Sequence, residues 1–454
     1  MRLKKWLNGT TLLAISSLLV ACGTGPGEAE DEANEETAGG DSSALTIDWW
    51  TPSWSDEENE WIENSVEEFN ESQSEIFVNL DVIPGDAWDQ RVTAAQAAGT
   101  APDITTMNYN KIAFSAEQNE IMALDEYVDP SIFEDLHDNI EGFVSIGDEH
   151  YAYPFFVEPS AVLFYRKDFF EEAGLDAEMP PTTWEELIEA GKALGDGNRA
   201  GLAAAGNATE IAWTHWGWQK MVGGSLINDE WSEATINSPE ITELVNFWGQ
   251  LHEEGILPPQ GFEGGYNEIT PLADGQAAMQ ISGSWVIGQL RNQYPDILDD
   301  IGVAVVPTPD GNQEVATATL GGWTLTVDGM SDNPQEAADF ITWLLADDEE
   351  RLVSFFRDVT RFSKFPARES VDQVINEDPE GSKDPWRQLI ADEIVPYAVP
   401  EPIFAWEISM SYATAVENVY LGGMNVESAL EEAENEINTY IENNNYAGTN
   451  PRQQ

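Results

Sequence analysis

The stretches Leu-Thr-Ile-Asp-Trp-Trp at 45–50 and Ile-Phe-Val-Asn-Leu-Asp-Val-Ile at 76–83 each read as a β-strand. Between them, Ser55 and Glu58 have the spacing of a helix-capping box, and apolar residues then recur at helical spacing over 62–69. The order strand, loop, helix, strand is the unit of a parallel sheet with helices on its faces. We therefore predict an α/β fold.

The alternation of strands and helices continues along the chain. Further strands are predicted at 103–106, 161–165, 277–281, 301–306 and 323–327. Helices are predicted at 91–99 and 167–174, after a cap at Thr182 or Thr183, and from Pro239 and Pro334 onward. The 454 residues exceed what one hydrophobic core usually supports, so two lobes are expected.

The N-terminus has the features of a secretory signal. Basic residues at 2–5 precede the apolar run Leu12–Val20, which is too short to span a bilayer. The run leads into Leu-Val-Ala-Cys at 19–22, which resembles the lipobox of bacterial lipoproteins. That resemblance implies a signal peptide over 1–21 and acylation of Cys22 with chains such as palmitate.

The residues after the lipobox have a different composition. Residues 22–44 are rich in Gly, Glu, Asp and Ala and have no apolar periodicity, so we predict a disordered acidic tether. The expected location is the extracytoplasmic face of the cell membrane, with Cys22 as the lipid anchor. No later stretch is apolar for long enough to span a bilayer.

The charge of the chain is strongly acidic. It has 84 Asp and Glu against 19 Lys and Arg, a formal net charge of −65. Phosphate recognition needs a basic footprint, so nucleic-acid binding is excluded. High salt screens such self-repulsion, and we infer a halophilic or haloalkaliphilic bacterium.

Motifs for metals, cofactors and catalysis are absent from the sequence. No metal-ligand spacing joins the histidines at 137, 150, 215 and 252, and the only cysteine is Cys22. Neither a P-loop nor a nucleophile elbow occurs. We therefore predict no catalytic residues, no metal and no cofactor.

Aromatic residues gather at the ends of predicted strands and in loops. Aromatic rings stack on the C–H faces of sugars, while amides and carboxylates satisfy the hydroxyls. In open α/β sheets, ligands bind beyond the carboxyl ends of strands. The candidate ligand-binding residues at such positions are Trp50, Asn108, Tyr109, Trp213, Trp216, Trp285, Trp323 and Trp406. Trp61, Trp184, Trp248 and Trp343 lie on apolar helix stripes and are assigned to packing.

Five stretches in order are similar to the extracellular solute-binding proteins of family 1, which include the maltodextrin-binding protein. They are Gly99–Ile104, Tyr153–Glu158 with Leu163–Asp168 and Ala173–Leu175, Pro181–Leu187, Asp274–Trp285, and Gly321–Trp323 with Asn333–Leu344. Together they cover most of residues 45–430. The resemblance implies a two-lobed periplasmic-binding fold of type II, with a mostly parallel sheet in each lobe and a hinge of several segments.

The resemblance also implies boundaries. The first lobe is expected over 45–155 and 318–366, the second over 156–317 and 367–447, and a frayed tail over 448–454. Crossings between the lobes are expected near Tyr153–Pro159, Gln313–Leu320 and Arg361–Arg368.

Residue roles follow from the same resemblance. Trp50, the loop after it, Asn108 and Tyr109 would line the cleft between the lobes, and Trp285 would be the stacking platform. Glu158 would bind hydroxyls, although it could equally cap a turn. Gly322 would admit close approach of the ligand beside Trp323. The resemblance implies a ligand-binding role less directly for Arg361 and Trp406, and Arg361 could instead pair with a nearby carboxylate.

The implied function is a monomeric sugar receptor that delivers its ligand to the permease of an ABC importer and catalyses nothing. Two alternatives stay open. One is a receptor of the same fold for a polyamine, a betaine or a peptide, because indoles also bind quaternary ammonium groups. The other is an extracellular enzyme that cleaves glycans.

Overall fold

The computed structural model describes residues 44–258, 260–262 and 265–451. The predicted signal peptide, Cys22 and nearly all of the acidic tether lie outside these residues. In the described part of the chain, every helix is too short or too polar to cross a membrane.

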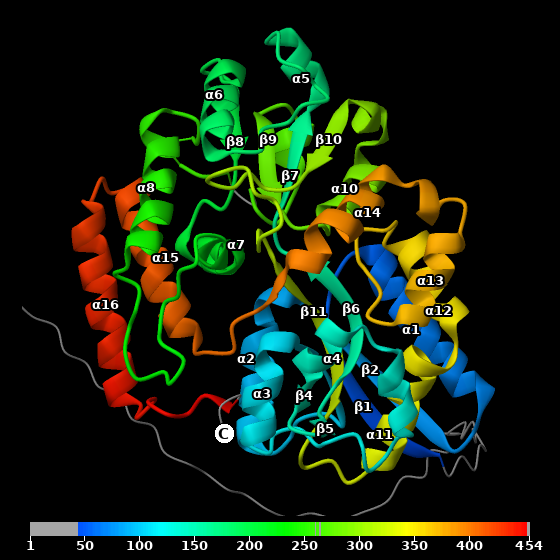
Figure 1. Ribbon diagram of the computed structural model, residues 1–454. Helices are drawn as coiled ribbons and strands as arrows, with labels where there is room; N and C mark the ends of the chain where they lie inside the picture. The colour runs from blue at the N-terminus through cyan, green and yellow to red at the C-terminus, as the bar shows by residue number, and fades with distance from the viewer. Residues whose placement is uncertain (1–43, 259, 263–264, 452–454) are drawn as a thin grey trace, which may run out of the picture. The chain divides into compact units, whose positions relative to one another are not determined.

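The first lobe is built on a six-stranded sheet with the order β12-β11-β3-β1-β2 and with β6 also paired to β11 (Figure 1). Its strands are β1 (Leu45–Pro52), β2 (Ile76–Ile83), β3 (Ile104–Asn108), β6 (Tyr153–Pro159), β11 (Thr319–Val327) and β12 (Val399–Pro400). The predicted opening unit is confirmed: β1 and β2 are parallel, and α1 (Asp56–Ser72) joins them with the Ser55–Glu58 capping box formed. The other elements of this part are α2 (Gly85–Ala98), α3 (Tyr109–Glu117), α4 (Asp138–Val144), the β4–β5 hairpin (Ser145–Ile146, Glu149–His150), α11 (Pro334–Thr342), α12 (Glu349–Ser354) and α13 (Glu369–Glu377).

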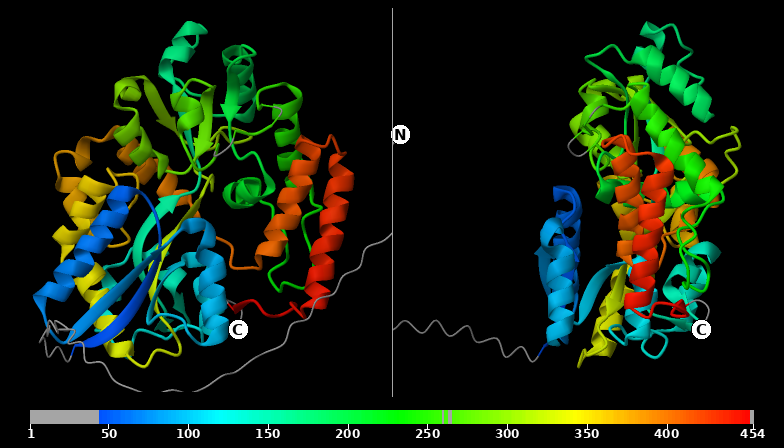
Figure 2. Two further views of the ribbon diagram at one scale, coloured as in Figure 1. Left: turned by 180° about the vertical axis from the view of Figure 1, so that it is seen from behind. Right: turned by 90° about the vertical axis from the view of Figure 1, so that its left-hand side faces the viewer.

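The second lobe is built on a four-stranded sheet with the order β10-β7-β9-β8. Its strands are β7 (Val162–Arg166), β8 (Ala200–Ala203), β9 (Ala277–Ser282) and β10 (Ile301–Ala304). Its helices are α5 (Lys167–Glu172), α6 (Trp184–Leu194), α7 (Ala208–Met221), α8 (Pro239–Glu253), α9 (Thr270–Ala273), α10 (Val286–Gln293), α14 (Pro385–Leu389), α15 (Trp406–Tyr420) and α16 (Val426–Asn443). Figure 2 shows α15 and α16 side by side beyond α8, in orange and red.

The strand directions are more mixed than the sequence predicts. In the second sheet only β8 and β9 pair in parallel, whereas β7 is antiparallel to both of its neighbours. In the first sheet β11 is antiparallel to β3 and β6. Residue periodicity reports that a segment is a strand, but direction depends on which lobe the chain arrives from.

The predicted crossing segments lie side by side. Val157 and Phe365 exchange two backbone hydrogen bonds of 2.9 and 2.8 Å, and Leu320 pairs with Pro159. A fourth segment joins them, since Val399–Pro400 pairs with Thr319–Leu320. The sequence analysis did not predict this fourth segment.

The chain beyond 366 differs from the predicted boundary. Arg368 and Ser370 both bond the carboxylate of Asp135, so α13 is held by the first lobe, although we predicted the second lobe from 367. These polar contacts are long-range and carry no sequence periodicity.

Most of the predicted frayed tail is also ordered. The Gly448 N–H donates to the Glu230 carbonyl at 2.8 Å, and Pro451 is buried. The anchor is Tyr446, whose buried ring stacks on Trp231 at 4.9 Å. Residues 452–454 lie outside the described residues.

Replacing Thr183, the N-cap of α6, tests how much this cap contributes to the stability of the fold. Its hydroxyl accepts from the Glu186 N–H at 3.1 Å, and the Thr183 N–H donates to the Glu186 carboxylate at 3.2 Å. Thr183→Ala is expected to lower the free energy of unfolding by about 1 kcal/mol, because it leaves a helix N–H without its partner. Urea denaturation of both proteins measures this, and an unchanged midpoint would contradict the role of the cap.

Candidate functional site

Two carboxylates meet where the chain segments cross between the lobes. Glu158 on β6 lies opposite Gly321 on β11. A Cβ atom on Gly321 would lie 2.3 Å from Glu401 Oε1, so glycine is needed there for Glu401 to approach. The Oε2 atoms of Glu158 and Glu401 are both buried and have no hydrogen-bond partner among the described residues. A buried carboxylate oxygen without a donor is costly, so this pair is suited to an incoming hydroxyl or ammonium group.

A buried lysine sits beside the carboxylates. Lys364 Nζ lies 2.6 Å from Glu58 Oε1 and 4.0 Å from Glu158 Oε2. It also lies over the rings of Phe156, at 4.1 Å, and Trp54, at 5.1 Å. Burial alone would raise the pKa of Glu58, but the Lys364 ammonium and the Ser55 hydrogen bonds outweigh it and lower the pKa. Lys364 therefore forms its closer ion pair with Glu58 and not with Glu158.

The pKa values of Glu158 and Glu401 are shifted upward, opposite to that of Glu58. Burial raises the pKa of Glu158, with Lys364 opposing the shift and Glu58 adding to it. Burial and the Glu158 charge raise the pKa of Glu401 from its ordinary 4.5 to about 8. At neutral pH the Glu401 carboxyl therefore carries a proton that it can donate.

The raised pKa makes Glu401 a source of pH-dependent stability. Between pH 4.5 and about 8 the folded state holds a proton that the unfolded chain has released, so stability falls as the pH rises through this window. Glu401→Gln cannot titrate. We expect the unfolding free energy of the native protein minus that of this variant to fall by up to about 1.4 kcal/mol per pH unit over that window. Denaturation series at pH 5, 6, 7 and 8 measure the difference, and a constant difference would contradict the assignment.

Aromatic rings of the first lobe lie next to the carboxylates. The half-buried Trp54 lies 5.4 Å from Phe156 and 5.9 Å from Trp323 between ring centroids. Trp323 in turn lies 6.5 Å from Trp88. Trp50 joins Trp323 in a small cluster with Ile83, Trp88 and Val92, and the Arg91 guanidinium lies 4.4 Å over its ring.

The predicted residues Asn108 and Tyr109 belong to the same region. The Asn108 amide donates to the Gly322 carbonyl at 3.4 Å, and the Tyr109 hydroxyl donates to the Phe156 carbonyl at 3.3 Å. Burial raises the pKa of Tyr109, and the charges of Glu401 and Glu158 raise it further. Gly322 has φ +136°, and a Cβ there would lie 2.3 Å from the Phe156 carbonyl oxygen, so close packing of β6 on β11 already requires glycine.

The second lobe contributes Trp285 and Tyr266. Their rings meet edge to face at 5.3 Å, and the Trp285 indole folds back over Gly283, where a Cβ would lie 1.9 Å from the ring. The buried Tyr266 hydroxyl donates to the Ser160 carbonyl at 2.9 Å. The charges of Glu401 and Glu158 add to the burial that raises the pKa of Tyr266. Tyr266 and Tyr109, from different lobes, therefore lie within electrostatic reach of the same two carboxylates.

A third aromatic group forms on α7 and α15. Trp213 lies 4.7 Å from Trp216 and 5.0 Å from Trp406 between ring centroids. Trp216 is buried and donates to the Ser409 hydroxyl at 2.8 Å, whereas Trp213 and Trp406 are half-buried. Trp216 thus has a packing role that the sequence alone does not separate from ligand contact.

Arg361 stands apart from these groups. Its side chain is exposed, its backbone lies in the left-handed region at φ +54°, and its carbonyl accepts a hydrogen bond from Arg291. The described contacts place it on the outer part of the third crossing segment.

Four residues of this region escaped the sequence analysis as individual candidates. They are Glu58, Tyr266, Lys364 and Glu401. Glu58 is hidden because its capping-box role already explains it. Glu401 stands between two prolines at the end of the fourth crossing, and recognition of that crossing would have drawn attention to it.

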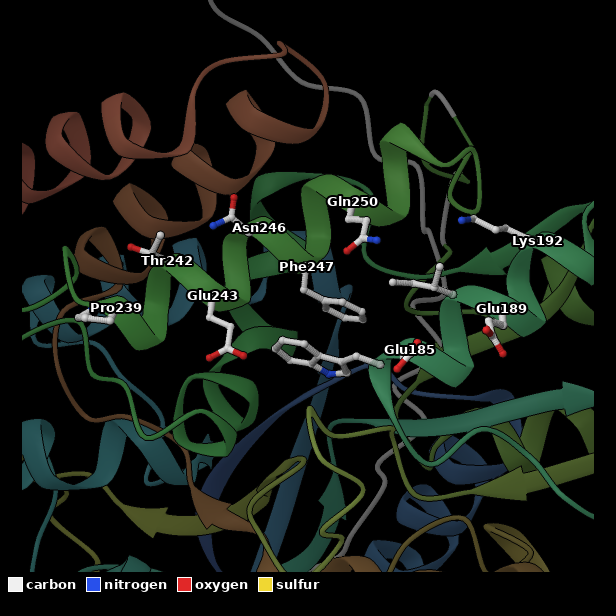
Figure 3. A pocket seen from close by; sticks show the side chains of 11 residues that line it. Glu185, Glu189, Lys192, Pro239, Thr242, Glu243, Asn246, Phe247 and Gln250 are labelled. Carbon is white, nitrogen blue, oxygen red and sulfur yellow. The ribbon is translucent and has the colours of Figure 1, made fainter.

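A separate hollow lies on the second lobe between α6 and α8 (Figure 3). Trp184 and Phe247 stack at its floor, 4.0 Å apart, while Glu189, Glu243 and Gln250 line it. Both rings are buried, which agrees with the packing role predicted for Trp184. The hollow contains none of the predicted binding residues.

The described residues hold no group of three or more His, Cys, Asp or Glu side chains placed to bind a metal ion. The site consists of aromatic rings, carboxyl groups and amides.

Comparison with known proteins identifies the family. The family model described as bacterial extracellular solute-binding protein matches residues 54–351. This chain belongs to that family.

Curated relatives of this solute-binding protein are distant. A "Probable ABC transporter-binding protein" of Deinococcus radiodurans is 28% identical over 214 residues, which are 46% of this chain and 50% of the relative. The arabinooligosaccharide-binding protein of Halalkalibacterium halodurans is 25% identical over 322 residues, 68% of this chain and 70% of the relative. The chain thus spans half of the first relative's length and more of the second's.

Solved structures support the fold. Maltose-bound MalE3 of T. maritima has a TM-score of 0.74 at 22% identity, with 87% of this chain and all of that chain covered. A Thermotoga lettingae solute-binding protein, solved with α-D-tagatose, has a TM-score of 0.73 at 24% identity, covering 87% of this chain and 99% of that one. The predicted two-lobed α/β fold is confirmed.

Proposed function

We propose that this protein is the substrate-binding lipoprotein of an ABC importer and that it binds a di- or oligosaccharide between its lobes. One observation carries the proposal: the buried Oε2 atoms of Glu158 and Glu401 have no hydrogen-bond partner among the described residues, and each lobe contributes an aromatic pair, Trp54 with Trp323 and Tyr266 with Trp285. Sugar hydroxyls would supply the missing donors, and the indoles of Trp285 and Trp323 would stack on the pyranose faces. The relatives named for arabinooligosaccharide and maltotriose support a carbohydrate as the ligand class.

The mechanism uses the segments that cross between the lobes. A ligand that contacts Trp285 from one lobe and Trp323 from the other favours the closed arrangement over the open one. The closed receptor then presents its ligand to the membrane permease. Acylated Cys22 and the acidic tether 22–44 would hold it at the extracytoplasmic face as a monomer.

The acidic composition supports a working environment of high salt. A net charge of −65 repels itself strongly in dilute buffer, and salt screens that repulsion. We infer a halophilic or haloalkaliphilic host. Binding measurements belong in molar salt for the same reason.

A thermal-shift screen in molar salt tests the ligand class. Sugars of one to four residues are compared with betaine, spermidine and short peptides, because a ligand raises the melting temperature through its affinity for the folded state. We expect the largest rise with an oligosaccharide. A rise with betaine or spermidine alone would favour a receptor for cationic solutes, which two carboxylates among indoles also suit.

A second assay addresses catalysis. The protein is incubated for a day with each sugar that binds, and the mixture is analysed by mass spectrometry. We expect every glycan to remain intact. Shortened products that appear with the native protein and not with Glu158→Gln would make it an enzyme.

A further inference from the structure

A further cavity lies beside the carboxylate pair, between the second lobe and the fourth crossing segment. It has a volume of about 210 Å³ and is lined by the last turns of α7, the loop at 225–231, β12 with the coil after it to Phe404, and Asn450. Figures 1 and 2 show that the loop after α7 (green) and the coil leading into α15 (orange) both lie below α7. Such a volume holds far more than one water molecule.

Two unpartnered polar side chains line this cavity. Gln219 is 4% exposed and Glu401 is 9% exposed, and both Gln219 Nε2 and Glu401 Oε2 are buried without a hydrogen-bond partner in the described structure. Buried amide donors without acceptors are rare because each costs free energy. An N–H donor and a carboxyl oxygen that share a cavity fit one hydroxyl group, which accepts from the first and donates to the second.

The apolar walls of the cavity are aromatic. Trp216 and Trp231 line it, together with Phe404. Trp231 is held in the left-handed region at φ +53°, which is costly for a bulky side chain. Its ring is clamped by Tyr446 at 4.9 Å and by Phe114 at 6.1 Å. The ordered C-terminal segment therefore fixes a strained tryptophan at the cavity wall.

The cavity shares walls with the site proposed above. Glu401 Oε1 lies against the backbone of Gly321, opposite Glu158, and Glu401 Oε2 has no hydrogen-bond partner in the part of the chain that the structure describes. Trp216 belongs to the aromatic group with Trp213 and Trp406. Glu401 and Trp216 therefore belong both to the cavity and to the site proposed above.

We infer that this cavity is an additional subsite that takes one terminal sugar residue of a bound oligosaccharide, with Gln219 and Glu401 as its hydroxyl partners and Trp216 and Trp231 as its walls. The inference rests on the proposed function and deepens it. It makes this protein selective for chain length: an oligosaccharide fills both places, whereas a monosaccharide fills only the first.

The test uses Gln219→Met, which keeps the side-chain length and removes the amide donor and acceptor that a sugar hydroxyl would use. Gln250→Met is the matched control, because Gln250 also lies on a helix and lines the separate hollow between α6 and α8 (Figure 3). Calorimetry in molar salt measures mono-, di- and trisaccharides of glucose, mannose and arabinose on the full-length mature protein. We expect Gln219→Met to weaken the longest bound sugar about five- to tenfold, from the loss of a buried hydrogen bond, and to leave monosaccharide affinity within about twofold.

The outcomes separate the two proposals. If sugars bind the native protein and Gln219→Met affects all lengths equally or none, the subsite is wrong and the proposed function stands. If no sugar binds the native protein, the proposed function fails and the subsite fails with it. A loss of equal size in Gln250→Met would also overturn the subsite, since it would reflect a general effect on the lobe.

Discussion

Trp285→Ala is expected to weaken oligosaccharide binding about 10- to 100-fold while the melting temperature of the unliganded protein stays nearly unchanged. The Trp285 ring is only half-buried and touches Tyr266 at its edge, so the fold depends little on it. A sugar stacked on the ring would bury it, and full burial of such a side chain is worth about 1.5–3 kcal/mol. Titration calorimetry of both proteins measures the affinity, and differential scanning calorimetry measures the melting temperature.

Gly283→Ala provides an independent check on the same ring. A Cβ there would lie 1.9 Å from the indole, so the ring must move from its place even though tryptophan is retained. We expect a loss of affinity in the same direction as for Trp285→Ala. If both variants bind as tightly as the native protein, Trp285 is not the stacking platform.

Lys364→Met is expected to lower the free energy of unfolding by about 3–5 kcal/mol at pH 7. The substitution leaves the buried Glu58 carboxylate without its ammonium partner at 2.6 Å and removes the partial compensation of Glu158. The loss should shrink as the pH falls, because without Lys364 burial raises the pKa of Glu58 and the carboxyl of the variant takes up a proton. Guanidinium denaturation of the native protein and the variant at pH 7 and pH 5 measures the loss of stability and its dependence on pH.

The double variant Lys364→Met/Glu58→Gln separates the unpaired charge from lost packing. Removing both partners leaves no buried charge at this pair, so much of the stability should return. Glu350→Gln is a control, because that carboxylate is exposed and 3.6 Å from Arg357. A double variant as unstable as Lys364→Met would show that the lysine acts through packing on Trp54 and Phe156.

Local patterns predicted the elements of this fold well. The capping boxes at Ser55 and Thr183 and the proline at the start of α8 mark helix starts where the structure has them. Such signals involve residues three or four apart, so the sequence holds them directly.

Contacts between residues far apart in the chain could not be predicted from the sequence. The pairing of β12 with β11, which brings Glu401 to Gly321, joins residues far apart, and β12 has only two residues and so no periodicity. The Lys364–Glu58 pair likewise joins distant residues, and each residue alone resembles a surface charge. The tail at 448–451 reads as polar and frayed, yet it is held by Tyr446 on Trp231.

The crystal structure of the complex with the best-binding oligosaccharide from the screen is the most direct test. We predict a sugar ring against the Trp285 indole and hydroxyls within 3.2 Å, or about hydrogen-bond distance, of Glu158 Oε2 and Glu401 Oε2. A sugar bound elsewhere, with these two oxygens still lacking a donor, would contradict the account.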